Sequence, residues 1–122
     1  MYTRGIRGAT TVERNTEEDI ITATGELLEK MIEANGIDPD YVASAVFTTT
    51  KDLNAQFPAA AARQMGWSNV ALMCGHEMDV PGSLKMCIRI LIHINTDKNA
   101  GEIPHIYING AKNLKSNHGF QD

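Results

Sequence analysis

A single arginine interrupts a long apolar run, and this run constrains the fold more than any other segment of the chain. Residues 86–94 read Met-Cys-Ile-Arg-Ile-Leu-Ile-His-Ile, a composition typical of a β-strand inside a sheet. Side chains alternate between the two faces of a strand, so Ile88, Ile90 and Ile92 share an apolar face, whereas Arg89 lies on the other. A cation with little water around it requires an anion, which belongs either to the protein or to a ligand.

Length and composition limit the class of protein. A chain of 122 residues, 43% of them apolar, predicts one globular domain, which we place at residues 1–115, followed by a flexible tail at residues 116–122. A net charge of −4 without a basic block argues against nucleic-acid binding. The longest apolar run is far shorter than the ~20 residues of a membrane span, and the N-terminus lacks the apolar core of a signal peptide. These features indicate a soluble, cytoplasmic protein without membrane partners.

The hydrophobic pattern predicts an α+β domain with the element order β-α-β-α-β-β-β. A capping pattern, Thr16 followed by Asp19, starts the first helix, which ends near Ala34, and Pro58 opens a second helix that ends near Met65. The predicted strands are residues 2–12, 44–50, 70–74, 86–94 and 103–109. We expect them to form a single mixed five-stranded sheet with the helices on one face.

The sheet face opposite the helices has an unusual composition. It would carry a mixture of small, apolar and charged side chains: Arg7, Ala9, Cys87, Arg89, Leu91, His105 and Tyr107. Such a face is too apolar for ordinary solvent-exposed surface and too charged for a core. A second subunit that covers it, with a polar site between the subunits, satisfies both facts.

Several polar side chains are candidates for this site, and each has a structural alternative. Arg7 stands between small residues that leave room for a carboxylate bound in bidentate fashion, or it is a surface arginine. Arg89 binds a ligand, or it forms a structural ion pair with Glu77 or Asp79. Tyr107 offers its hydroxyl to a carboxylate, or it is a half-buried tyrosine without a ligand.

Other candidates have less support from the sequence. Arg63 stands among alanines of the second helix, where an arginine is usually solvated. Cys74 has His76 nearby but no histidine and acid arrangement that would make it a nucleophile. The histidines and cysteines show no metal-ligand spacing, and no glycine-rich phosphate loop is present. We therefore expect neither a metal nor a cofactor.

Three segments form a pattern that is specific in combination. They are Arg-Gly-Ile-Arg-Gly-Ala-Thr-Thr-Val-Glu at residues 4–13, Asp-Leu-Asn-Ala-Gln-Phe-Pro-Ala at residues 52–59 with Arg63, and Cys-Gly-His-Glu-Met-Asp-Val at residues 74–80 leading to Lys-Met-Cys-Ile-Arg at residues 85–89. In this order and spacing they closely resemble the monofunctional AroH-type chorismate mutases, the trimeric class with a pseudo-α/β-barrel. The likeness extends from Arg4 to about Leu114.

The resemblance implies an isomerase of aromatic amino acid biosynthesis in the shikimate pathway, which rearranges chorismate to prephenate without a covalent intermediate, cofactor or metal. It also implies a homotrimer with sites at the subunit interfaces. One chain would supply Arg7, Cys74, Glu77, Arg89 and Tyr107, of which Arg89, Glu77, Arg7 and Cys74 would be catalytic and Arg7 and Tyr107 would hold a carboxylate. For substrate binding its neighbour would supply Phe57, Ala59, Arg63 and Leu72, and Met73 is a further binding residue.

The chain departs from the family pattern at Ala60, where relatives commonly have lysine, and at Met73, where they often have threonine. Two other interpretations stay open. One is a trimeric imine or enamine deaminase of the RidA type, which also uses a strand arginine to grip a carboxylate between subunits, although it does not predict Cys74, Glu77 and Arg89 together. The other is a non-catalytic protein that binds small carboxylates, which would show binding without turnover.

Overall fold

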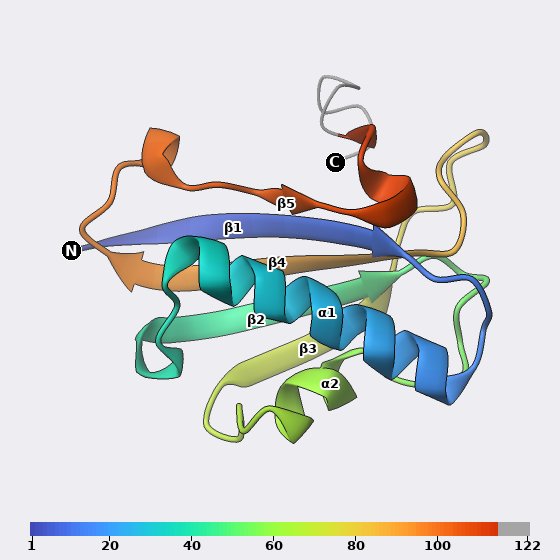
Figure 1. Cartoon of the computed structure of the whole chain (residues 1–122), viewed down its shortest axis with the longest axis horizontal. Coiled ribbons are helices and arrows are strands. Elements are labelled where there is room, and N and C mark those ends of the chain that lie inside the picture. Colours follow the sequence, from blue (N-terminus) through green and yellow to red (C-terminus); the bar gives the residue numbers. More distant parts are fainter. Residues whose placement is uncertain (115–122) are drawn as a thin grey trace.

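The computed structural model describes residues 1–114, and this part of the chain forms one mixed sheet of five strands with two α-helices on one face (Figure 1). The strands are β1 (Tyr2–Thr11), β2 (Val42–Thr49), β3 (Ala71–His76), β4 (Cys87–Thr96) and β5 (Ile106–Tyr107), and the helices are α1 (Glu17–Asn35) and α2 (Ala59–Gln64). The strand order is β3-β2-β4-β1-β5, and the central strand β4 runs antiparallel to both neighbours. The predicted α+β class and element order are confirmed.

Strand β4 has the alternation that its sequence predicts. Ile88, Ile90 and Ile92 are at most 2% exposed and pack in the clusters that contain residues of α1. Arg89 and Leu91 are half-buried on the opposite face. The strand therefore separates a dry core from a face that carries a cation.

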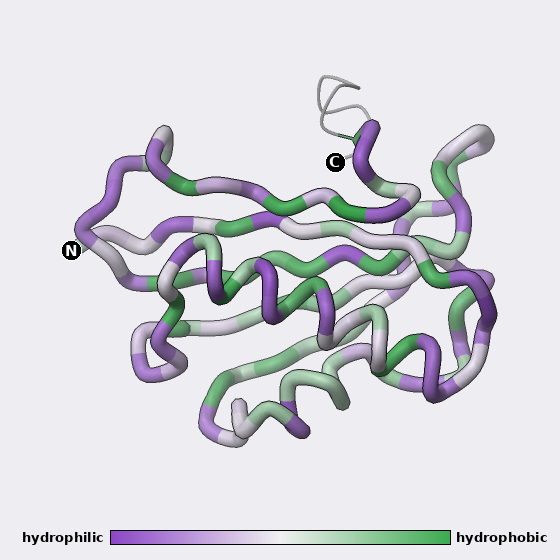
Figure 2. Tube along the Cα trace, in the orientation of Figure 1, coloured by the Kyte–Doolittle hydropathy of each residue, from purple (hydrophilic) through white to green (hydrophobic). Residues whose placement is uncertain are grey.

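Helix α1 packs closely on β1 because β1 has a glycine at the crossing point. Along α1, hydrophobic and hydrophilic residues alternate, as expected of a helix with one buried face (Figure 2). A Cβ on Gly8 would lie 2.4 Å from Sδ of Met31 and 3.2 Å from Cδ1 of Leu27. The missing side chain lets the helix approach the strand next to Arg7.

The helix ends follow the signals in the sequence. Thr16 caps α1, its Oγ1 accepting a hydrogen bond from the Asp19 N–H at 3.1 Å, and Gly36 ends the helix in the left-handed conformation (φ 60°). Pro58 stands at the N-cap of α2, one position earlier than predicted. No helix within residues 1–114 is long and apolar enough to cross a membrane.

All five strands differ from the prediction at one end or both, by one or two residues in β1, β2 and β4 and most clearly in β5. Strand β3 continues past Cys74 to His76, and β4 begins at Cys87 because Met86 has a positive φ of 51°. Strand β5 spans Ile106–Tyr107 instead of residues 103–109. Pro104 has no N–H for a ladder bond, and 3₁₀ turns lie on both sides of this short edge strand.

The sheet face away from the helices is partly covered by the segment that follows β5. Ala111 and Leu114 are buried against Ala9 and Cys87. Over the rest of this face no helix of residues 1–114 is packed, as Figure 1 shows. This leaves room for a site on the open face of the sheet. The tail predicted at residues 116–122 lies outside the described residues.

Candidate active site

A pocket of about 230 Å³ opens on the sheet face away from the helices. Four residues predicted for the site line it: Arg7, Glu77, Arg89 and Tyr107. They come from β1, from the position just after β3, from β4 and from β5. We call this hollow the arginine pocket. Val46, Thr48 and Leu91 also line it, so its walls combine charge with apolar surface.

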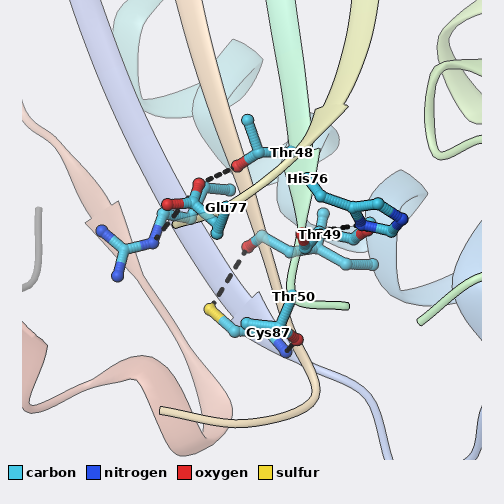
Figure 3. A network of polar contacts seen from close by, with 8 residues as sticks. Thr48, Thr49, Thr50, His76, Glu77 and Cys87 are labelled. Atoms are coloured by element: carbon cyan, nitrogen blue, oxygen red, sulfur yellow. Dashed lines mark hydrogen bonds and ion pairs between the residues drawn. The ribbon is translucent and has the colours of Figure 1, made fainter. Parts of the chain in front are cut away.

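Arg89 and Glu77 form the charged centre of the arginine pocket. Nε of Arg89 lies 3.9 Å from Oε2 of Glu77, and the two side chains are 19% and 27% exposed. Thr48, which pairs with Arg89 across β2 and β4, donates a hydrogen bond from Oγ1 to Oε2 of Glu77 (Figure 3). The ion pair considered as the structural alternative for Arg89 is present. Both of its members also line the pocket, so the pair does not exclude a ligand.

Arg7 and Tyr107 lie on adjacent strands at the other side of the arginine pocket. Tyr107 pairs with Ala9 in the parallel ladder of β1 and β5, and Arg7 precedes Ala9 by two positions on the same face. The Arg7 side chain is exposed, whereas Tyr107 is half-buried against the cluster of Ala9 and Cys87. The Arg7 guanidinium and the Tyr107 side chain therefore both border the arginine pocket, as the strand alternation predicts.

The start of β4 is held by Thr50 and Asp52, which were not among the candidate site residues, although Asp52 opens the segment 52–59 of the family pattern. The Asp52 carboxylate accepts hydrogen bonds from the Met86 N–H (3.0 Å) and from Oγ1 of Thr50 (2.5 Å). The Cys87 N–H donates to Oγ1 of Thr50 at 3.0 Å (Figure 3). These bonds hold the left-handed backbone at Met86 and so fix where the strand of Arg89 enters the sheet. A Thr-Lys-Asp turn is common, and its composition alone does not predict that it binds the backbone at the start of β4.

Cys87 lies in the floor of this region and is chemically inert. Its side chain is fully buried on the same face as Arg89. Burial raises the pKa of the Cys87 thiol to about 11, although the nearby Arg89 lowers it. The thiol stays protonated near neutral pH, so it packs and does not act as a nucleophile.

Cys74 lies apart from the arginine pocket, contrary to the grouping expected from the family resemblance. It pairs with the fully buried Phe47 and packs against the core beneath the helices. Side chains alternate along β3, which ends at His76, and Cys74 does not line the arginine pocket that Glu77 borders. Cys74 instead lines a separate hollow of about 380 Å³ with Phe57 and His76. We call this second site the phenylalanine hollow.

The other residues predicted to bind substrate are dispersed. Phe57 and Met73 are 66% and 64% exposed, and Arg63 is exposed on α2. Ala59 is 2% exposed within the core, and Leu72 packs against that core from β3. Of these residues, Phe57 is the one that joins Cys74 in the phenylalanine hollow.

Comparison with known proteins identifies the family. The sequence profile described as chorismate mutase type I matches residues 3–118. The chain belongs to the type I chorismate mutase family. It is 50% identical over 109 residues to the chorismate mutase AroH of Bacillus subtilis strain 168, and the match spans 88% of this chain and 86% of that relative.

Two further relatives support the same family assignment. The chorismate mutase AroH of Thermus thermophilus is 50% identical over 113 residues, which cover 92% of this chain and 93% of the relative. The solved structure of a chorismate mutase from Clostridium thermocellum matches with a TM-score of 0.87 at 56% identity and covers 88% of this chain and 96% of that chain. The chain is therefore an isomerase of aromatic amino acid biosynthesis, and the interpretation as a RidA-type deaminase is wrong.

Proposed function

We propose that this chorismate mutase converts chorismate to prephenate in the arginine pocket, and that a neighbouring chain completes the pocket in a homotrimer. The observation that carries the proposal is the convergence of Arg7, Glu77, Arg89 and Tyr107 on one pocket from separate strands. Two arginines and a phenolic hydroxyl suit a substrate with two carboxylates. A single glutamate among them suits the positive charge that develops on the substrate ring.

Arg89 is proposed to stabilise the negative charge of the transition state. In this Claisen rearrangement the ether C–O bond breaks ahead of C–C bond formation, so negative charge gathers on the enolpyruvyl oxygen. A guanidinium that is 19% exposed on the central strand can meet this oxygen with little reorganisation. An acceleration of about a millionfold corresponds to roughly 8 kcal/mol, and one preorganised donor contributes about 3–4 kcal/mol in comparable sites.

Glu77 is proposed to accept a hydrogen bond from the ring hydroxyl and to face the positively charged ring. Its contact with Thr48 supports this role, because one carboxylate oxygen is held while the group borders the pocket. Arg7 and Tyr107 are proposed to bind one carboxylate in both ground and transition states, which lowers KM more than it raises kcat. Arg63 of the neighbouring chain would approach the ring carboxylate at the open end.

The neighbouring chain is proposed to contribute its phenylalanine hollow. Phe57 and Met73 are large apolar side chains that are 66% and 64% exposed, which is typical of surface that another chain covers. The open sheet face with Leu91 also lacks a cover within residues 1–114 of one chain. Cys74 then belongs to the neighbour's half of the site together with Phe57, and Ala59 and Leu72 support that half from the core.

The activity is tested by following the loss of chorismate absorbance and identifying prephenate as the product. Replacement of Arg89 by citrulline keeps the shape and removes the charge, and we expect kcat to fall by about 10²–10³-fold with the oligomer intact. The matched control is citrulline at Arg14, an exposed arginine whose Nε lies 3.1 Å from Asp19, where kcat should not change. No acceleration by unmodified protein at micromolar concentration would refute the activity, and a fall of less than tenfold would make Arg89 mainly structural.

The shared site is tested by mixing two impaired variants. Arg89→Gln damages the arginine pocket, and Phe57→Asp places a carboxylate opposite a dianionic substrate. If each site draws its halves from two chains, trimers reassembled from an equal mixture contain about a quarter of intact sites, and activity returns to that extent. Activity that stays at the level of the separate variants would contradict the shared site, and sedimentation gives the oligomeric state.

A further inference from the structure

At the border of the arginine pocket, the imidazole of His105 takes the place of a backbone carbonyl as a hydrogen-bond acceptor. The N–H of Arg7 donates a hydrogen bond to Nδ1 of His105 at 2.9 Å. A backbone N–H can only donate, so Nδ1 must offer a lone pair, and the ring is neutral with its proton on Nε2. The backbone of Arg7 is therefore tied to the neighbouring strand by a bond that exists in one protonation state of one side chain.

This bond anchors one end of a very short strand. Strand β5 has two residues and aligns Tyr107 with Ala9 of β1. On its C-terminal side, the Asn109 amide donates to Oγ1 of Thr10 at 3.0 Å. On its N-terminal side, the bond from β1 to His105 is one anchor, and the Asn35 amide, which donates to the Pro104 carbonyl at 3.1 Å, is another. The spacing between Arg7 and Tyr107 thus depends on anchors on both sides of the strand.

We propose that neutral His105 is a positioning residue of the chorismate mutase site and makes its affinity for substrate depend on pH. The inference rests on the proposed binding of a carboxylate by Arg7 and Tyr107. When the ring takes up a second proton from solvent, Nδ1 becomes a donor that faces the Arg7 N–H, and the bond is lost. Arg7 and Tyr107 then lose one of the bonds that fix their spacing, while the ladder of β1 and β5 remains, and KM rises. Arg89, which is proposed to stabilise the transition state, lies on β4, so kcat changes little.

Among residues 1–114, the charged groups found near His105 come from α1 and β1, and Tyr107 is a titratable neighbour on β5. Lys30 and Glu33 of α1 line a hollow with His105 and Tyr107 at the outer edge of β5. The guanidinium of Arg7 belongs to the residue on β1 that is bonded to the ring. Arg7 and Lys30 oppose a further positive charge on the imidazole, whereas Glu33 favours it. The balance of these charges sets the pH at which the bond is lost.

The test compares two substitutions in the full chain. His105→Asn places an amide oxygen near the position of Nδ1, and this acceptor does not titrate. His105→Leu has no acceptor. Initial rates of chorismate loss give KM and kcat between about pH 5.5 and about pH 8.5, the range in which histidine titrates. We expect the KM of the unmodified protein to rise toward low pH, the KM of His105→Asn to rise much less, and that of His105→Leu to be raised about three- to tenfold throughout.

The controls separate this inference from the function on which it rests. Glu33→Gln changes a charge of the same hollow without touching the bond, so it should move the midpoint of the KM profile to lower pH. Arg7→Gln should raise KM at every pH, and an unchanged KM would remove the proposed role of Arg7. If Arg7→Gln raises KM but His105→Leu does not, the positioning role alone is overturned.

Two further outcomes also decide against the positioning role. A fall in kcat that matches the loss of folded protein, with KM unchanged, means that His105 is merely structural. If His105→Leu does not fold, the profile of His105→Asn decides, because retention of the original pH dependence of KM would refute the role and its loss would support it.

Discussion

The close contact between α1 and β1 predicts that Gly8→Ala destabilises the protein. The new Cβ would lie 2.4 Å from Sδ of Met31, whereas ordinary contacts are 3.4–4 Å. The sulfur must therefore retreat by about 1 Å or more. Met31 is fully buried, so it has no open space to enter, and either its rotamer or the position of the helix must change.

The magnitude follows from two opposing terms. Overpacking of a close-packed core costs about 1–3 kcal/mol, whereas exchanging glycine for alanine restricts the unfolded chain and stabilises by about 0.4–1 kcal/mol. The net loss is up to about 2.6 kcal/mol, and the flexibility of the thioether reduces it. Gly25→Ala is the matched control in α1, since its Cβ meets nothing within 4 Å. That variant should be about 0.5–1 kcal/mol more stable than the original chain.

Urea unfolding at one fixed protein concentration measures both changes, because association links stability to concentration. Trp67 is the single tryptophan and is 2% exposed, so its fluorescence reports the transition. Combining Gly8→Ala with Met31→Ala should cost less stability than the sum of the two single losses, with a coupling of about 0.5 kcal/mol or more. If Gly8→Ala gains as much stability as Gly25→Ala, the packing explanation is refuted.

Three further predictions concern the pocket and its floor. Asp52→Ala removes the acceptor of the Met86 N–H, so urea unfolding should show a loss of about 1–3 kcal/mol, and the loosened start of β4 should lower kcat. The Cys87 thiol, with its pKa raised from 9.0 to about 11, should leave stability unchanged below pH 9 and reduce it as pH rises from 9 to 11, because the unfolded chain releases the proton first. Cys87→Ala should lack that decline in pH-dependent unfolding. Thr48→Val removes the donor to Glu77 and should lower kcat/KM about tenfold in the chorismate assay, and unchanged kinetics would show that the contact is dispensable.

Local patterns predict most of the fold because they report burial directly. A strand with isoleucine at alternate positions must bury that face, and the structure buries Ile88, Ile90 and Ile92. The same alternation assigns Arg89 to the other face before any contact is known. The two ends of α1 could also be predicted from the sequence, since Thr16 and Gly36 satisfy backbone groups there.

The parts that could not be predicted depend on contacts between distant segments. Ile103 to Asn109 has the composition of a strand, yet the ladder covers Ile106–Tyr107 and a side chain replaces one of its neighbouring backbone acceptors. The positive φ at Met86 requires Asp52, which is 34 residues away, as an acceptor. No local sequence pattern marks His105 or Asp52 as a hydrogen-bond acceptor, because the folded sheet brings each of them to its donor from a distant part of the chain.

The two faces of β3 bear on the proposal that two chains form one site. The strand pairs through its backbone with β2, so Cys74 on one face and Glu77, which follows the strand, are separated by the sheet itself. Within one chain the two groups line different hollows, Glu77 the arginine pocket and Cys74 the phenylalanine hollow. The proposed site brings both groups to one substrate by drawing them from different copies, and β3 is an edge strand of the sheet formed by residues 1–114. The proposed interfacial site thus follows from the alternation of side chains along a strand, the same rule that sets Arg89 apart from the core.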